Sequence, residues 1–370
     1  MKLTIDRNAL MRALSHVQAV VERRNTIPIL SNILLNAEGD RLSLTATDLD
    51  IEATDAAEAK VKKAGSITAP AQTLFDVVRK LPEGAEIALD LSESRLSISA
   101  GRSKFALPTL PAADFQTMPQ ESSPVKFEIE AAELRRLIDK TRFAISTEET
   151  RYYLNGIYLH HAKSGSKNVL RAVATDGHRL ALAEGEAPKG SSGLKGVIIP
   201  RKAVQEVRRL LEDAPETVSV EASDSKIIFR IGEAVLTSKL IDGSFPDYQR
   251  VIPKENGRIL TVDNKAFSAA VDRVATVSAE RSRSVKLSLS SGKLTLAVSH
   301  SESGQGTEEL EADYAAEPME IGFNAKYLLD VAQQIESEDA RIEFNDAASP
   351  ARVLDAKDSG AQYVLMPLRV

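Results

Sequence analysis

Apolar and polar positions along the chain follow the same pattern three times. Each copy opens on a short alternating strand, at residues 3–5, 127–129 and 260–262. An amphipathic segment follows, in which apolar side chains recur every three to four positions, and then come strands in which they alternate. The openings lie about 124 and about 133 residues apart, a spacing typical of whole domains rather than of solenoid repeats. We therefore expect three similar domains.

Within each copy the pattern itself runs twice, as helix, strands, helix, strands, which indicates an internal duplication. The expected helices cover residues 7–20 and 71–80, 130–142 and 201–212, and 265–276 and 325–336. Strand pairs follow the second helices, at residues 86–91 and 95–100, 217–222 and 226–231, and 341–344 and 352–354. Many hairpin strands with few helices favour an α+β fold with helices on one face of antiparallel sheets. We expect the domains at 1–122, 123–253 and 254–370.

Composition narrows the class of protein. With 370 residues, 43% of them hydrophobic and 27% charged, the chain has the make-up of a soluble globular protein of two to three domains. It contains no cysteine, which excludes disulfides, thiolate catalysis and cysteine-ligated metals. No apolar signal core or run of about 20 apolar residues is present. We therefore expect a cytoplasmic protein with no membrane partner.

The net charge of −6 argues, as a bulk number, against nucleic-acid binding. The charge is unevenly distributed, because the six expected helices together carry about +6 and the rest of the chain about −12. Lysine and arginine on ordinary solvated helix faces would explain this. A basic surface built of helices would explain it equally well, and could hold a polyanion through phosphate contacts without reading sequence.

The densest polar cluster, residues 175–179, includes Asp176 and His178, a pair that could act as a general base. No serine or cysteine nucleophile setting surrounds it, so an enzyme using the Asp176–His178 pair is only an alternative to a polar turn. His160 and His161 are adjacent and point to opposite faces of a strand, which disfavours a shared metal. No phosphate-binding loop occurs. We expect no metal and no cofactor.

Two segments could contact partners. Tyr152 and Tyr153 follow Arg151, and such tyrosines either pack on a sheet or contact nucleic acid. Apolar residues also continue to the end of the chain, over residues 363–370. Most chain ends are polar and frayed, so an apolar end indicates either core or one wall of a groove that accepts a partner.

Seven segments, in order along the whole chain, resemble the bacterial sliding clamp family, the beta subunit of DNA polymerase III. They are residues 24–30 with Asn32, 101–105, 109–115, 151–156, 174–180, 245–248 and 366–369. The resemblance implies a homodimer joined head to tail in a closed ring of six domains, with helices lining the channel. Duplex DNA would pass through the ring without sequence specificity. The protein would be a processivity factor with no active site. Besides this function and the enzyme alternative, a ligand-binding structural protein is a third possibility.

The resemblance also implies site residues. Arg24, Tyr152 and Tyr153 match positions that contact DNA, although Glu148 and Glu149 stand where the family often has a polar uncharged residue. A groove for short peptides with leucine and aromatic anchors would serve the polymerase alpha subunit, the clamp loader, other polymerases and repair proteins. Its matching residues are Leu154, Thr175, Gly177, His178, Arg179, Leu180, Pro246, Arg250, Val251, Asn324, Tyr327, Met366, Pro367, Leu368 and Arg369.

The groove wall near Ala348 and Pro350 departs from the commonest family pattern, which implies a shifted peptide preference. The joint between subunits is implied by the same resemblance. On one chain it would use Arg102, Lys104, Phe105 and Leu107, and on the other Thr276, Val277, Glu308 and Glu309. Thr276 replaces a more apolar residue, which implies a weaker joint.

Overall fold

The computed structural model describes residues 1–370 except 23–25, 120–121, 278–283, 302–303 and 370. The chain forms two compact units. Unit 1 comprises Met1–Arg135, Pro188–Leu194 and Lys202–Leu240, and unit 2 comprises Arg136–Ala187, Lys195–Arg201 and Ile241–Val370. The division falls inside the middle third of the chain because the strands of that third belong to two different sheets.

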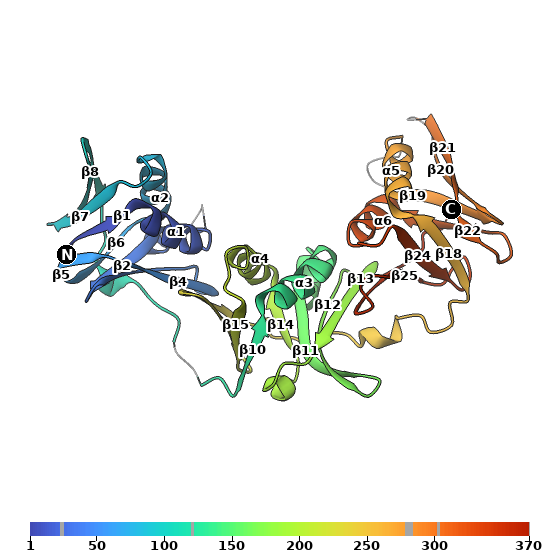
Figure 1. Ribbon diagram of the computed structural model, residues 1–370, viewed down its shortest axis with the longest axis horizontal. Helices are drawn as coiled ribbons and strands as arrows, with labels where there is room; N and C mark the ends of the chain where they lie inside the picture. The colour runs from blue at the N-terminus through green and yellow to red at the C-terminus, as the bar shows by residue number, and fades with distance from the viewer. Residues whose placement is uncertain (23–25, 120–121, 278–283, 302–303, 370) are drawn as a thin grey trace. The chain divides into compact units, whose positions relative to one another are not determined.

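The first third contains strand, helix and strands twice, as the pattern predicted. Its elements are β1 (Lys2–Asp6), α1 (Arg7–Gln18), β2 (Asn32–Glu38), β3 (Arg41–Thr47), β4 (Ile51–Glu58), β5 (Lys60–Lys63), β6 (Gly65–Pro70), α2 (Ala71–Lys80), β7 (Glu86–Ser92), β8 (Arg95–Ala100) and β9 (Ser103–Pro108). Helices α1 and α2 pack against each other, and α1 also covers β3 and β4 (Figure 1).

The middle third repeats this order. Its elements are β10 (Val125–Glu130), α3 (Ala131–Thr141), β11 (Gly156–Ser164), β12 (Lys167–Thr175), β13 (Arg179–Glu186), β14 (Val197–Pro200), α4 (Arg201–Leu210), β15 (Thr217–Ala222), β16 (Lys226–Ile231) and β17 (Ala234–Lys239). Short 3-10 helices lie at η3 (Arg142–Ala144), η4 (Glu149–Leu154) and, after β17, η6 (Tyr248–Arg250).

The last third again places two helices side by side, α5 and α6 (Figure 1). Its elements are β18 (Arg258–Asp263), α5 (Asn264–Ala275), β19 (Ser284–Ser290), β20 (Lys293–His300), β21 (Gly304–Glu311), β22 (Asp313–Tyr314), β23 (Met319–Asn324), α6 (Ala325–Ala332), β24 (Asp339–Phe344), β25 (Ala351–Asp355) and β26 (Ala361–Leu365). The helix expected over 325–336 is shorter than predicted and ends at Ala332.

All described strand pairs are antiparallel, and two sheets run from one third of the chain into the next. The eight-stranded sheet has the order β10-β15-β16-β17-β4-β3-β2-β6, and the nine-stranded sheet has β14-β11-β12-β13-β26-β25-β24-β18-β22. We call the pairing of β17 with β4 the first joint and the pairing of β13 with β26 the second joint. The other sheets have the orders β5-β1-β7-β8-β9 and β21-β20-β19-β23, and β9 and β21 are each one of their two edge strands.

Local sequence explains why the helices begin where they do. The Asp6 carboxylate accepts hydrogen bonds from the backbone N–H groups of Asn8 and Ala9 at 2.8 and 3.0 Å. Asp263 plays the same part for α5, accepting from Ala266 N–H at 2.6 Å. A capping aspartate satisfies backbone donors that have no partner within the helix, and its charge suits the helix dipole.

The core follows the predicted periodicity. Leu10, Leu14 and Val17 of α1 are fully buried, as are the alternate residues Leu42 and Leu44 of β3. One stripe of each helix therefore packs on one face of a sheet, and the other sheet face is left for other contacts. None of the helices in the described part of the chain has both the length and the apolar character that a membrane crossing needs.

Candidate partner groove and subunit edges

The second joint has an apolar surface on the sheet face opposite the helices. Val173, Leu180, Leu182 and Val364 from β12, β13 and β26 form a buried cluster with Tyr248. Across the joint, Leu180 is the register partner of Val364. The cluster is completed by Tyr158, Phe245 and Ile252, of which the last two belong to the segment between β17 and β18. This segment lies over the sheet and gives the predicted groove one wall.

The end of the chain lies beside the turn at residues 177–180. Met366 N–H donates to the His178 carbonyl at 2.9 Å, and Leu368 N–H donates to the Gly322 carbonyl at 2.8 Å. The ring of His178 stacks on that of Tyr327, with centroids 6.4 Å apart. The structure therefore brings together predicted groove residues from the turn, from α6 and from the chain end.

Exposure divides the predicted groove residues into two sets. Val251, Met366 and Leu368 are 44%, 39% and 37% exposed, which is unusual for large apolar side chains. Leu154 and Leu180 are buried beneath the surface. Pro246 and Arg250 lie in the 245–252 segment, where the exposed Arg250 pairs with Asp247 at 2.7 Å. Of the remaining predicted residues, Asn324 caps α6, Pro367 is half-buried and Arg369 is exposed.

Asp176 builds the turn rather than a catalytic pair. Its Oδ1 accepts from His178 N–H and Arg179 N–H at 2.9 and 3.0 Å, and its Oδ2 accepts from Arg179 Nε at 3.1 Å. Thr175 Oγ1 closes the turn by donating to the Arg179 carbonyl at 2.7 Å and accepting from Gly177 N–H. This geometry supports the polar-turn interpretation and not the enzyme alternative.

Arg179 lies beneath the predicted groove. Its side chain is 7% exposed and pairs with Asp330 at 2.5 Å in addition to Asp176. The guanidinium stacks 4.4 Å over the Tyr327 ring and 5.2 Å over the Phe143 ring. Because its charge is paired and its guanidinium contacts two rings, Arg179 positions the turn and Tyr327 rather than offering a free donor to a ligand.

Arg151, which is not among the groove residues that the resemblance implies, contacts the same turn. A Cβ atom on Gly177, whose φ is +88°, would lie 2.4 Å from Arg151 Nη1. Glu148 holds Arg151 with Oε2 at 2.8 Å from Nε and 2.7 Å from Nη2. Arg151 belongs to segment 151–156, which carries part of the resemblance, but no pattern in the sequence indicates its pairing with Glu148. The charge of Glu148 is therefore balanced within the chain.

The residues expected to contact DNA are only partly described. Arg24 lies outside the described residues. Tyr152 is 54% exposed and its ring meets that of Tyr153 edge-on, with centroids 5.9 Å apart. Tyr153 is half-buried against Gly243, where a Cβ would lie 3.1 Å from the Tyr153 Cβ. Tyr152 is therefore the more accessible of the two.

The predicted interface residues lie on or next to the free edge strands. In unit 1, Phe105 of β9 is 40% exposed, Arg102 and Lys104 are exposed, and Leu107 is buried. In unit 2, Glu308 and Glu309 of β21 are engaged within the chain. Arg273 of α5 holds Glu308 at 2.5 and 2.6 Å, and Lys293 holds Glu309 at 3.0 Å. Thr276 and Val277 follow the end of α5.

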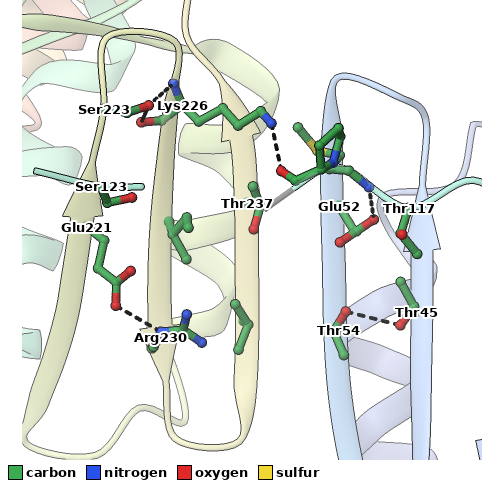
Figure 2. Close-up of a pocket in the computed structure, with 14 residues that line it drawn as sticks. Thr45, Glu52, Thr54, Thr117, Ser123, Glu221, Ser223, Lys226, Arg230 and Thr237 are labelled. Carbon is green, nitrogen blue, oxygen red and sulfur yellow. Dashed lines mark hydrogen bonds and ion pairs between the residues drawn. The ribbon is translucent and has the colours of Figure 1, made fainter. Parts of the chain in front are cut away.

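The first joint has a polar cavity where the second joint has its apolar cluster. At the first joint Glu52 is the register partner of Thr237, next to the pair Ala53–Leu236. At the second joint Leu180 is the register partner of Val364, next to the equivalent pair Ala181–Tyr363. Figure 2 shows the cavity between strands β3–β4 and β15–β17. Its volume is about 600 Å³ and its lining includes Thr45, Thr54, Lys226, Arg230 and Glu221. The lining of this cavity is therefore rich in charged and hydroxyl side chains, whereas the cluster at the second joint is apolar.

Within the described residues, no group of three or more histidines, aspartates or glutamates could hold a metal ion.

Comparison with known proteins covers nearly the whole chain. Residues 1–119, 128–247 and 249–369 match the N-terminal, central and C-terminal domain models of the DNA polymerase III beta subunit. The beta sliding clamp of Caulobacter vibrioides is 60% identical, and that of Escherichia coli K12 39%, each over 100% of both chains.

Solved structures agree with this match. A Caulobacter crescentus beta sliding clamp with bound PEG has a TM-score of 0.97 and 60% identity, covering 100% of this chain and 99% of that one. A sliding clamp from Bartonella birtlesii bound to griselimycin has a TM-score of 0.98 and 50% identity, covering 100% of both chains. The three-domain clamp fold is therefore confirmed, as is the absence of a catalytic role that the family implies. The chain belongs to the bacterial beta sliding clamp family, the processivity subunit of DNA polymerase III.

Proposed function

We propose that two copies of this chain join head to tail in a closed ring that encircles duplex DNA in the cytoplasm. The observation that carries this proposal is that β9 in unit 1 and β21 in unit 2 are sheet edges, and that the residues expected at the joint lie on or next to them. Unpaired edges expose backbone donors and acceptors and are templates for pairing with another chain. A head-to-tail contact that closes by rotation satisfies both edges of both chains.

The two internal joints supply the register of the third. Each domain consists of two halves, each with one helix followed by strands. In both internal joints the last strand of the second half of one domain, β17 or β26, pairs with a strand from the first half of another, β4 or β13. Leu236 is thereby paired with Ala53, and Tyr363 with Ala181. Strand β9 ends a second half and β21 ends a first half. When β8–β9 is aligned with β16–β17, Phe105 takes the position of Leu236. The register partner of Phe105 is Ile98, and that of Leu236 is Phe229. Aligning β20–β21 with β3–β4 places Gly306, opposite Val298, where Ala53 stands opposite Ala46. The two alignments together pair Phe105 with Gly306 of the other chain.

Packing supports that register. Leu236 and Tyr363 are fully buried, each opposite a small alanine, whereas Phe105 is 40% exposed. Gly306 offers the same small partner, and a Cβ there would already lie 3.3 Å from Val277 Cγ2. The Phe105 ring therefore fits over Gly306 and against Val277, which agrees with the expected interface residues. The domain boundaries 1–122, 123–253 and 254–370 remain part of this proposal.

Cysteine cross-linking tests the register, because the chain has no cysteine of its own. The alignment makes Ala106 and Gln305 partners across the joint. A chain that carries both Ala106→Cys and Gln305→Cys should therefore oxidise to a covalent dimer and to no larger covalent oligomer. Ala106→Cys with Thr307→Cys is the matched off-register control. Equal cross-linking of both pairs, or a monomer in light scattering, would contradict the proposed joint.

For DNA, we propose that contacts go to phosphates through helix side chains and through Tyr152 and Tyr153, without base readout. Cross-linking the ring after it has been loaded on DNA permits a direct test. Rings loaded on nicked circular DNA should stay bound in high salt and leave after the circle is linearised. Retention on linear DNA with open ends would contradict encirclement.

We further propose that the second-joint surface binds short peptides of the polymerase alpha subunit, the clamp loader and other replication and repair proteins. The exposed apolar residues Val251, Met366 and Leu368 support this, since apolar anchors need such a surface. Griselimycin is bound to the Bartonella birtlesii clamp, which is 50% identical to this chain, and we propose that it binds the second-joint surface here and can serve as its probe.

A further inference from the structure

Tyr248 is held from beneath by three neighbouring strands. His160 of β11 is the register partner of Arg171 of β12, and Arg171 is the register partner of Glu184 of β13. The Tyr248 hydroxyl lies 2.9 Å from Arg171 Nη1 and 3.0 Å from His160 Nε2. Glu184 Oε2 in turn holds Arg171 at 2.7 Å from Nε and 2.5 Å from Nη2. These four side chains form one continuous network.

The network has a single direction of hydrogen bonding. His160 Nδ1 lies 3.1 Å from the His161 carbonyl, which can only accept, so Nδ1 carries the proton. In the neutral ring Nε2 is then an acceptor, and the Tyr248 hydroxyl donates to it. The same hydroxyl accepts from Arg171, which can only donate. Each hydrogen-bonding group in this network is therefore a defined donor or acceptor, and each has its partner.

Aromatic packing fixes the network on its other side. The Tyr158 ring stacks on Phe245 at 4.9 Å with an interplanar angle of 4°, and on His160 at 4.7 Å. Phe245 and Tyr248 belong to the same segment, so this segment is attached to the sheet by a stack and by a hydrogen-bonded hydroxyl. Val251 N–H donates to the Tyr248 carbonyl at 3.1 Å, which ties Tyr248 directly to a groove residue.

We propose that Arg171 and His160 are positioning residues for the partner groove, acting through Tyr248 on the wall that carries Pro246, Arg250 and Val251. This inference rests on the proposed groove. Arg171 and His160 lie on the sheet beneath the segment, so they affect ligand binding only by fixing the position of the groove wall. Losing the hydroxyl leaves two buried polar groups without their partner, which favours other placements of the segment.

The network also makes the groove sensitive to acid. Burial, with smaller contributions from Arg171 and His161, lowers the pKa of His160 below its ordinary 6.5, against the raising influence of the His161 carbonyl and Glu184. His160 is therefore neutral at pH 7. Protonating Nε2 puts a second cation beside Arg171 and removes the acceptor of the Tyr248 hydroxyl. Tyr158 packs on the ring and supplies no compensating charge.

The first test measures griselimycin affinity of the full-length protein at pH 7.5 by calorimetry. Tyr248→Phe removes only the hydroxyl and should weaken binding by about fivefold or more, the worth of one buried hydrogen bond. Tyr314→Phe is the matched control, because Tyr314 is also buried and its hydroxyl donates to the Glu317 carbonyl. Binding by Tyr248→Phe within twofold of wild type overturns the inference. Failure of the wild type itself to bind overturns the proposed groove instead.

The second test is a pH profile of the same affinity, from pH 7.5 to 5.5. His160→Gln keeps hydrogen-bonding groups but does not titrate, so it should lose less affinity on acidification than the wild type. His178 is present in both proteins, and the difference between the two profiles therefore isolates His160. Parallel profiles overturn the acid sensitivity. This variant also keeps the inference testable where Tyr248→Phe fails to fold.

Discussion

His16 of α1 and Asp55 of β4 are joined by a hydrogen bond of 2.5 Å between Nδ1 and Oδ2, with Asp55 only 1% exposed. Arg273 and Glu308 occupy the corresponding places in the last third, on α5 and β21, and are likewise paired. In the middle third Ala183 stands at the aspartate position, and Lys140 binds Glu336 and the Gln334 carbonyl in its place. One helix–strand contact is therefore kept in two domains and redirected to the neighbouring domain in the other.

Asp55→Ala should lower the stability of unit 1 by about 2–3 kcal/mol, because it removes a buried carboxylate that binds His16 and the Ala56 N–H. The check is the midpoint of the first unfolding transition in urea. Asp90→Ala is the control, since the Lys2–Asp90 pair is exposed and should have no measurable effect. Equal shifts for the two variants would show that the buried pair contributes nothing particular.

Phe105→Ala should weaken each subunit joint by about 2 kcal/mol, or about 30-fold in the dissociation constant, because the ring loses its place over Gly306. Gly306→Leu should act similarly by filling that place from the other side. Sedimentation at decreasing concentration measures both effects. Ile259→Ala, which truncates an exposed apolar residue elsewhere on an edge region, should leave the dimer unchanged. A dimer unaffected by both interface changes would remove Phe105 from the joint.

Local pattern was enough to predict most elements but not how they pair. Helix α2 and strands β8, β15 and β16 have the predicted bounds because their periodicity ends sharply at turns. The prediction for 325–336 extended too far because Ile335 continues the apolar spacing, while the backbone turns there and Gln334 offers its carbonyl to Lys140. Periodicity reports burial and not backbone direction.

Pairing across the joints depends on residues about 180 positions apart, such as Thr54 and Val235. Every amphipathic edge strand looks alike in a sequence, so neither joint could be predicted from the strands alone. Buried charges were hidden for a similar reason. No sequence pattern indicates the partners of Arg171 and Arg179, which in the structure are Glu184 for Arg171 and Asp330 and the Tyr327 ring for Arg179.

Glu52→Gln should stabilise the first joint at high pH. Burial raises the pKa of the Glu52 carboxyl above its ordinary 4.5, against the lowering influence of the Met118 N–H and Lys226. The folded state therefore binds the proton more readily than the unfolded chain, and ionisation costs stability once the pH exceeds the folded pKa. The melting temperature should rise by about 1–3 °C at pH 8, and the gain should vanish towards pH 4.

The control for this change is Glu58→Gln, at the exposed end of the same strand, which should show no pH-dependent difference. The hydrogen bond from Met118 N–H to Glu52 Oε2, 2.8 Å long, is preserved because glutamine keeps a carbonyl acceptor. A stability gain for Glu52→Gln that persists unchanged at pH 4 would mean that relief of buried charge is not its cause.

Met366→Ala should weaken griselimycin binding by about tenfold, and deletion of residues 366–370 by more. Met366 is 39% exposed beside the His178 turn, so truncation removes apolar surface from the groove without opening the core. Leu110→Ala, an equally exposed apolar residue of unit 1, should bind like the wild type. Calorimetry gives the affinities and melting curves confirm that each variant is folded. If the deletion leaves affinity unchanged while the ring still forms, the partner groove lies elsewhere, since neither the proposed subunit joint nor encirclement uses the chain end.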